Sequence, residues 1–199
     1  MFPERILLTD KFRPLCQAWT QAFAKHTSVE VIDGDFFAQD ADLMVSPANS
    51  FGIMDGGLDA AIRDELAGDV QRIVQNVILE RHHGELPVGA CEIVATGHRR
   101  WPHLAVAPTM RVPESVANTV NAYLAFRATL LAVVSHNQRH VERPIRSLVV
   151  PGLGTGVGAM DPRRCAAQMR IAFDQVKAPA GIPSFKVIHQ THQKLRNAL

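Results

Sequence analysis

The sequence predicts an α/β fold, a three-layer α/β/α sandwich built on a central mixed sheet of about six or seven strands. Short apolar runs alternate along the chain with longer segments of helical period, which is the pattern of strands interleaved with helices. Each helix must bury its apolar stripe against the sheet, and right-handed crossovers place helices on both faces. A length of 199 residues suits one domain of this class, so we expect residues 1–199 to form a single domain.

Each expected element follows from a local pattern. The expected strands are short apolar runs at residues 6–8, 29–32, 42–46, 92–95, 104–107, 148–150 and 185–188. The expected helices cover residues 13–25, 59–67, 70–80, 116–136 and 162–176. In the fourth helix, Val116, Val120, Leu124 and Leu131 recur at spacings of four, four and seven residues, so one face is apolar. The Pro- and Gly-containing turns between elements read as connectors within one domain.

Composition restricts the class of partner. Apolar residues make up 47% of the chain, enough to fill a core of native density, which excludes an intrinsically disordered protein. Basic residues number 21 and acidic residues 19, so the net charge of +2 gives no strong signal for nucleic acid or for an anionic membrane. Any anion that the protein binds must therefore be held by local structure.

The remaining bulk features indicate a cytoplasmic protein without a metal or cofactor. The three cysteines are odd in number and far apart, which is typical of a reducing compartment. Charged residues near the amino terminus interrupt any signal-peptide core, and no run is apolar enough to span a membrane. The histidine pairs His136/His140 and His189/His192 have metal-ligand spacing but no third ligand in register.

The first candidate binding segment joins the expected strand at 42–46 to the expected helix at 59–67. Adjacent Gly56 and Gly57 let a ligand approach the main chain closely. The helix that begins near Asp59 directs free N–H groups and the positive end of its dipole at the same place. This strand, glycine-bearing loop and helix start together predict a phosphate-binding site.

Two polar side chains of this segment each allow two interpretations. The Asn49 amide could hold the hydroxyls of a sugar, or it could bond the neighbouring backbone and shape the loop. Asp59 could act as a base beside a bound sugar, or it could cap the helix start. Without further information, the structural role is the more common one for both residues.

The second candidate segment runs from Ser147 to Pro162 and again connects an apolar strand to a helix. It holds glycines at alternate positions, Gly152, Gly154, Gly156 and Gly158. Without side chains, such a loop can curve its N–H groups around an anion, and Thr155 can add a hydroxyl. Packing alone hardly explains four alternate glycines, which favours a second phosphate-binding loop.

The same segment matches a loose dinucleotide fingerprint, which raises an NAD-dependent oxidoreductase as an alternative. Gly154, Gly156 and Ala159 have the required spacing, and Asp174 follows Gly154 by twenty residues. The fingerprint normally opens a long half-domain of strands and helices. Here only one helix and one short strand are expected after it, and Asp174 falls inside that helix.

The two loops together resemble those of the macro domain family. The segments that carry the likeness are Gly34-Asp35-Phe36-Phe37, Ser46-Pro47-Ala48-Asn49, Gly56-Gly57-Leu58-Asp59-Ala60-Ala61-Ile62 and Pro151-Gly152-Leu153-Gly154-Thr155-Gly156-Val157-Gly158-Ala159. The Asn of the family's first loop precedes the Asp at its helix start by the same ten residues that separate Asn49 from Asp59. The resemblance covers residues 6–176.

The resemblance implies an ADP-ribose site with two catalytic residues. In hydrolytic macro domains, the positions of Asn49 and Asp59 hold the distal ribose and place or activate water at its anomeric carbon. The acidic position of Asp35 bonds the adenine amino group. The ligand-binding residues implied in this way are Asp35, Phe36, Ala48, Met54, Gly56, Gly57, Leu58, Pro151, Gly152, Gly154, Thr155, Gly156, Val157 and Gly158.

Three departures from the family pattern concern activity. Gly158 stands where an aromatic residue usually covers the distal ribose, a role that could pass to Phe51 or Met54. Asp55 adds a negative charge beside the expected diphosphate, which would repel the ligand unless the side chain turns outward or pairs with a base. Arg111, in an unusual proline-flanked segment, is a candidate counter-charge.

The expected function is therefore the binding of ADP-ribose and hydrolysis of the bond between its distal ribose and an acceptor. The partner is ADP-ribose or an ADP-ribosylated substrate, whose acceptor residue the sequence leaves open, as it does the oligomeric state. A non-catalytic reader of ADP-ribose and a phosphatase acting on ADP-ribose 1″-phosphate remain alternatives, since both would use the same cleft.

Overall fold

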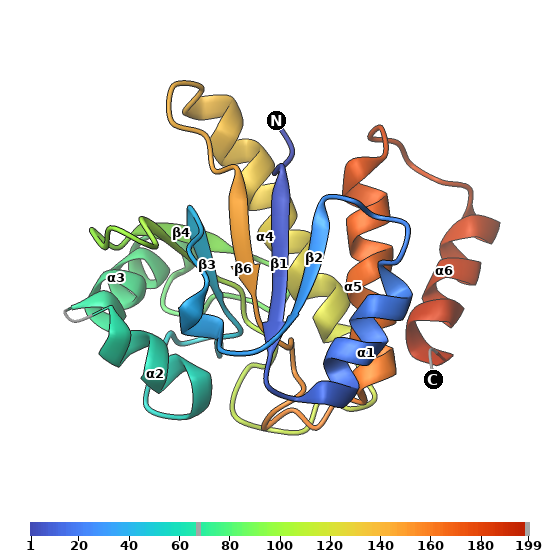
Figure 1. The fold of residues 1–199 in the computed structure, drawn as a ribbon, viewed down its shortest axis with the longest axis horizontal. Coiled ribbons are helices and arrows are strands. Elements are labelled where there is room, and N and C mark those ends of the chain that lie inside the picture. The colour runs from blue at the N-terminus through green and yellow to red at the C-terminus, as the bar shows by residue number, and fades with distance from the viewer. Residues whose placement is uncertain (67–68, 198–199) are drawn as a thin grey trace.

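A computed structural model describes residues 1–66 and 69–197 of the chain (Figure 1). The strands are β1 (Arg5–Asp10), β2 (Val29–Asp33), β3 (Leu43–Ser46), β4 (Glu92–Ala95), β5 (His103–Val106) and β6 (Ser147–Val150). The helices are α1 (Arg13–Ala22), α2 (Gly57–Glu65), α3 (Val70–His82), α4 (Asn121–Arg139), α5 (Pro162–Lys177) and α6 (Phe185–Asn197), with a short 3₁₀ turn η1 (Phe36–Ala38).

The strands form one mixed sheet in the order β2-β1-β6-β3-β5-β4. Neighbouring strands are parallel except β4, which runs antiparallel to β5. The predicted α/β class with a mixed sheet is confirmed. The order differs from the 3-2-1-4-5-6 order of a dinucleotide-binding fold, and Asp174 lies within α5, where it pairs with Arg170. The NAD-dependent alternative therefore loses its topological basis.

Helices cover both faces of the sheet, so the molecule has three layers (Figure 1). On one face α1, α4 and α5 bury large side chains such as Trp19, Phe126 and Phe173. On the other face, the shorter helices α2 and α3 contribute Ile62 and Val74. The central strands β1, β6, β3 and β5 are mostly buried, and their apolar side chains contribute to the core on both faces.

One expected strand is a helix. The run at 185–188 begins α6, which packs against α5 and not against the sheet (Figure 1). Leu195 is buried in this contact, and its carbonyl accepts a hydrogen bond from the Gln168 amide. Phe185 is 81% exposed, so the apolar residues that suggested a strand do not enter the core.

Other boundaries shift for local reasons. Helix α1 ends at Ala22 because the next residue, Phe23, turns into the core and packs edge-on against Phe173. Helix α4 begins at Asn121 instead of residue 116, and the Val116 N–H donates to the Gly158 carbonyl of the second glycine loop. The expected end of the second helix at residue 67 lies outside the described residues. None of the described helices is long and apolar enough to cross a membrane.

Candidate functional site

The two glycine-bearing loops lie side by side at the carboxyl edge of the sheet. Strands β3 and β6 pair directly, with Leu43 opposite Leu148 and Met44 opposite Val149. The loops that follow them, residues 47–56 and 151–161, therefore leave the same edge as neighbours. A cavity of about 640 Å³ lies between them and is lined by residues of both. This is the place where open parallel sheets bind ligands.

Most of the predicted site residues line this cavity. They are Ala48, Asn49, Gly56, Gly57, Leu58, Asp59, Pro151, Gly152, Gly154, Thr155, Gly156, Val157 and Gly158. Asp35, Phe36 and Met54 are not among the lining residues. Asp35 instead pairs with Lys11 and accepts from the Phe37 N–H at the start of η1, and these two bonds, the first more than the second, hold its pKa below the ordinary value. Phe36 and Met54 are buried in the core.

Helix α2 follows the first loop, and its amino-terminal end lies at the cavity. It begins at Gly57, which has a φ of 57°, a left-handed conformation that favours glycine. The residue before it, Gly56, is the N-cap and has no side chain to occupy the first N–H groups. Those N–H groups have no partner within the helix. The helix start therefore presents donors and a positive dipole end to the cavity.

The second loop is compact, and three of its glycines are required by packing. A Cβ on Gly152 would lie 2.2 Å from the Thr155 hydroxyl, and one on Gly158 would lie 2.5 Å from the Gly154 carbonyl. Gly154 has a φ of 74° and lies against Val116. Gly156 differs, since a Cβ there would meet no atom within 4 Å. The alternation of glycines thus reflects close packing at three positions and an open face at one.

Asn49 makes the structural bonds of the first loop. Its side-chain oxygen accepts from the N–H groups of Phe51 and Ile53, and its amide donates to the Ile53 carbonyl over 2.7 Å. The loop-shaping interpretation of Asn49 is therefore realised in the structure. The residue also lines the cavity, so its remaining amide hydrogen is available to a ligand.

Asp59 does not cap the helix, contrary to the more common interpretation. The N-cap is Gly56, and the Asp59 carboxylate instead accepts from the Ser46 hydroxyl at the end of β3, over 2.6 Å. Burial raises the pKa of Asp59 to about 6, and the Ser46 bond opposes part of that rise. A cavity carboxyl group that titrates near neutral pH can accept or donate a proton during a reaction.

The negative charge of Asp55 has a basic partner. The Arg63 guanidinium lies 3.4 Å from the Asp55 carboxylate and 2.9 Å from the Asp64 carboxylate, and it also donates to the Met54 carbonyl. Arg63 was not among the predicted site residues, although its place in α2 put it one helical turn beyond Asp59. Arg111, which the sequence suggested as a counter-charge, forms a two-bond pair with Glu85 and does not line the cavity.

Several lining residues were missed because they follow other strands. Asp10 is the last residue of β1 and Phe12 follows that strand, and Thr109, Met110 and Pro113 come after β5. The Asp10 carboxylate accepts from the N–H of Gly152, which ties the first strand to the second loop. Phe12 is 48% exposed and Val157 68%, so both put apolar surface at the cavity rim. Because ligands of such sheets bind at the carboxyl ends of strands, the expected ends of β1 and β5 in the sequence could have identified these residues.

Comparisons with known proteins agree with the geometry. The family model described as Macro domain matches residues 45–169. A protein of Aeropyrum pernix is 33% identical over 70% of this chain and 67% of its own length. A macro domain-containing protein of Listeria monocytogenes is 26% identical over 72% of this chain and 76% of its own length. Among solved structures, a mutant of the Oceanobacillus iheyensis macrodomain with ADP-ribose superposes with a TM-score of 0.59 at 17% identity, covering 71% of this chain and 74% of that one.

Proposed function

The chain belongs to the macro domain family, and from this premise we propose that its cavity binds ADP-ribose and hydrolyses the bond from the distal ribose to an acceptor. The observation that carries the proposal is the Asp59 carboxyl group, whose pKa burial raises to about 6, in a cavity between two loops rich in backbone donors. The related macrodomain solved with ADP-ribose supports the choice of ligand.

The two loops would hold the diphosphate. The first N–H groups of α2, at Gly57 and Leu58, have no helical partner and face the cavity. The open face of Gly156 lets a phosphate approach the main chain of the second loop. Two phosphates bound in this way fix the ligand along the cavity, which makes the later attack nearly intramolecular. The exposed apolar surface of Phe12 and Val157 would cover the bound nucleotide at the rim.

Hydrolysis would follow at the anomeric carbon of the distal ribose. Asp59 in its ionised form takes a proton from a water molecule as the water oxygen bonds to that carbon. The bond from the carbon to the acceptor breaks, and the departing acceptor atom keeps the electron pair and takes up a proton. The transition state has oxocarbenium character, as in glycoside hydrolysis. Asn49 would orient the ribose through its remaining amide hydrogen.

An assay of ADP-ribose release from a mono-ADP-ribosylated protein tests this function. We expect the wild type to release ADP-ribose, Asp59→Ala to lose roughly 100-fold or more in kcat, and Asn49→Ala to lose activity with a rise in KM. Glu65→Ala, an exposed position of the same helix, is the matched control and should retain wild-type rates. Equal background release by the wild type and Asp59→Ala would remove the hydrolase and leave binding, measured by calorimetry, as the function.

A reader that binds ADP-ribose without cleaving it is the second candidate. The observation that favours it is that the Asn49 side chain makes three hydrogen bonds to the backbone of its own loop, which leaves few of its polar groups for a ligand. Gly158 cannot carry the aromatic cover that the family usually has, because any Cβ there collides with the Gly154 carbonyl. A phosphatase acting on ADP-ribose 1″-phosphate is separated from both candidates by assaying release of inorganic phosphate from that compound.

A further inference from the structure

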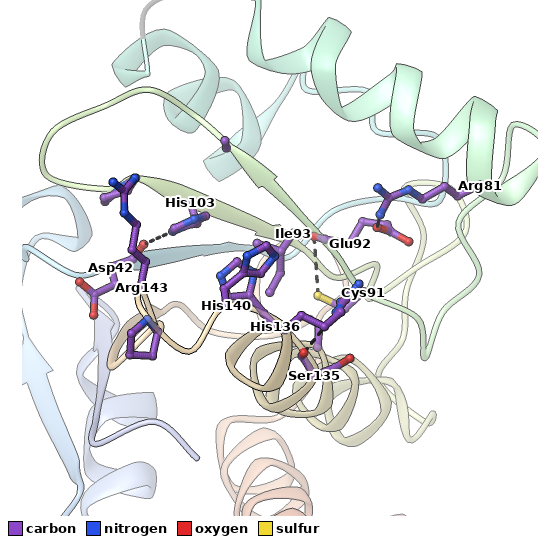
Figure 2. A pocket seen from close by; sticks show the side chains of 15 residues that line it. Asp42, Arg81, Cys91, Glu92, Ile93, His103, Ser135, His136, His140 and Arg143 are labelled. Carbon is purple, nitrogen blue, oxygen red and sulfur yellow. Dashed lines mark hydrogen bonds and ion pairs between the residues drawn. The ribbon is translucent and has the colours of Figure 1, made fainter. Parts of the chain in front are cut away.

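A second cavity, of about 880 Å³, lies between the β4–β5 edge of the sheet and the carboxyl-terminal part of α4 (Figure 2). Its walls include His103, the first residue of β5, and Asp42, which directly precedes β3. Residues at β4, Arg81 of α3, the carboxyl-terminal part of α4 and the segment after it complete the lining. The glycine loops follow the other ends of β3 and β6, so the two cavities share no lining residue.

Three histidines lie together in this cavity. The His136 ring centroid is 5.1 Å from that of His103 and 4.4 Å from that of His140. Figure 2 shows His136, near the end of α4, next to His140, which follows the helix, with the His103 ring on the facing strand. The Nδ1 of His103 lies 3.1 Å from the Asp42 carbonyl, so a backbone bond fixes this ring. The sequence suggested only the pair on the helix.

The cavity also holds arginines without carboxylate partners. Among the described residues, neither Arg139 nor Arg143 forms an ion pair, and both line the cavity. The two lining carboxylates are engaged elsewhere. Glu92 pairs with Arg81 and His82. The Asp42 carboxylate accepts from the Ser147 hydroxyl and from the backbone N–H groups of Arg146 and Ser147.

Protonation of the central histidine is disfavoured by its surroundings. Burial, His103, His140 and Arg139, in this order, lower the pKa of His136. The charged or titratable groups that line the cavity with it are Asp42 before β3, Arg81 on α3, Cys91 and Glu92 at β4, His103 on β5, Arg139 on α4, and His140 and Arg143 beyond α4. An anion bound beside His136 would raise the pKa of its ring, since an opposite charge stabilises the protonated form.

The cluster is not arranged for a metal ion. Within residues 1–66 and 69–197, no group of three His, Cys, Asp or Glu side chains is placed to hold one. The volume is that of a small-molecule site, and the wall combines donors with apolar side chains such as Ile93, Ala132 and Pro144. Guanidinium and imidazole groups both line the cavity, and both can donate to the several oxygens of a phosphoryl group. We propose that this cavity binds a phosphorylated small molecule, with its phosphate beside the three histidines.

Imidazole NMR signals of the full chain provide the test, because no histidine lines the glycine-loop cavity. Sulfate is the first probe, since its charge stays constant near neutral pH. We expect it to shift the ring signals of His103, His136 and His140 and to leave those of His189 and His192 on α6 in place. The dissociation constant should be at least about threefold lower near pH 6 than near pH 8, because binding and histidine protonation favour each other.

Variants and a second probe complete the test. The Arg139→Ala/Arg143→Ala double variant should bind sulfate at least about tenfold more weakly, whereas Arg127→Ala, an exposed position of α4 outside the cavity, should match the wild type. Phenyl phosphate should bind several-fold tighter than inorganic phosphate if the apolar wall takes part. Equal shifts of all histidines, undiminished binding by the double variant, or equal affinity for the two phosphate compounds would overturn the proposal.

Discussion

The Ser46 hydroxyl donates a hydrogen bond to the Asp59 Oδ1 over 2.6 Å. This contact joins the last residue of β3 to the first turn of α2 across the first glycine loop. It is the only described bond to the Asp59 side chain, and it opposes the rise in pKa that burial causes. The pKa of Asp59 is therefore set by burial, which raises it, and by one neutral donor, which lowers it.

Removal of that donor should raise the Asp59 pKa further. In Ser46→Ala, the carboxylate keeps its burial and loses its hydrogen bond, so its pKa should move above the wild-type value of about 6. A carbon NMR titration of the carboxyl group measures the change directly, and the acid limb of the hydrolysis rate should shift to higher pH. Ser135→Ala, on α4, is the control. An unchanged or lowered Asp59 pKa would contradict this account.

Asp59→Asn should stabilise the protein at alkaline pH while it removes activity. The folded-state pKa is raised from 3.8 to about 6, so the favourable contribution of Asp59 is present below 3.8 and lost as pH rises through 6. Near pH 8 the buried charge costs on the order of 2 to 3 kcal/mol, which the amide avoids. Denaturant unfolding should show the gain near pH 8 and none near pH 4. A variant less stable than the wild type at both pH values would refute this explanation.

The second loop should respond differently to alanine at two neighbouring glycines. Gly158→Ala forces a Cβ to within 2.5 Å of the Gly154 carbonyl and 2.6 Å of Val116, so the free energy of unfolding should fall by about 1–3 kcal/mol. Gly156→Ala meets no atom within 4 Å and should leave stability almost unchanged. It should nevertheless weaken ADP-ribose binding, because its methyl group stands where the ligand approaches the main chain. Calorimetry and thermal unfolding distinguish the two effects.

Loss of Arg63 should expose the bound diphosphate to the Asp55 charge. Arg63→Met should weaken ADP-ribose binding several-fold, more so at low salt, because the Asp55 carboxylate then lacks its partner 3.4 Å away. Adding Asp55→Asn should restore most of the affinity. Arg72→Met on α3, which breaks an exposed pair with Asp69, is the control. If the single variant binds as tightly as the wild type, Asp55 does not influence the ligand.

The fold could be predicted largely from the sequence because buried parallel strands are nearly continuous apolar runs. Leu148 and Val149 belong to such a run and lie in the centre of the sheet. The run at 185–188 has a similar apolar character over four residues, yet it begins helix α6. Short apolar runs do not distinguish the two structures, and Leu195, the residue that anchors α6, lies beyond the run.

The site was less predictable, because side-chain roles depend on contacts across the fold. The position of Asp59 at a helix start suggested a cap, and only the neighbouring strand end at Ser46 shows where its carboxylate turns. Likewise, alternate glycines suggested an anion cradle at every position, whereas the collisions at Gly152 and Gly158 arise from the folded loop itself. Spacing identified the segments that meet, and packing determined what each residue does there.

The central place of β6 affects how the protein is made. Until residues 147–150 leave the ribosome, the strands already synthesised form at most a β2-β1 pair and a β3-β5-β4 group, because β6 alone connects β1 to β3. Each group then has an open edge that can pair with other chains. The nascent chain is therefore prone to aggregation until β6 has been made, and a product truncated before Ser147 would have neither a complete sheet nor the second glycine loop.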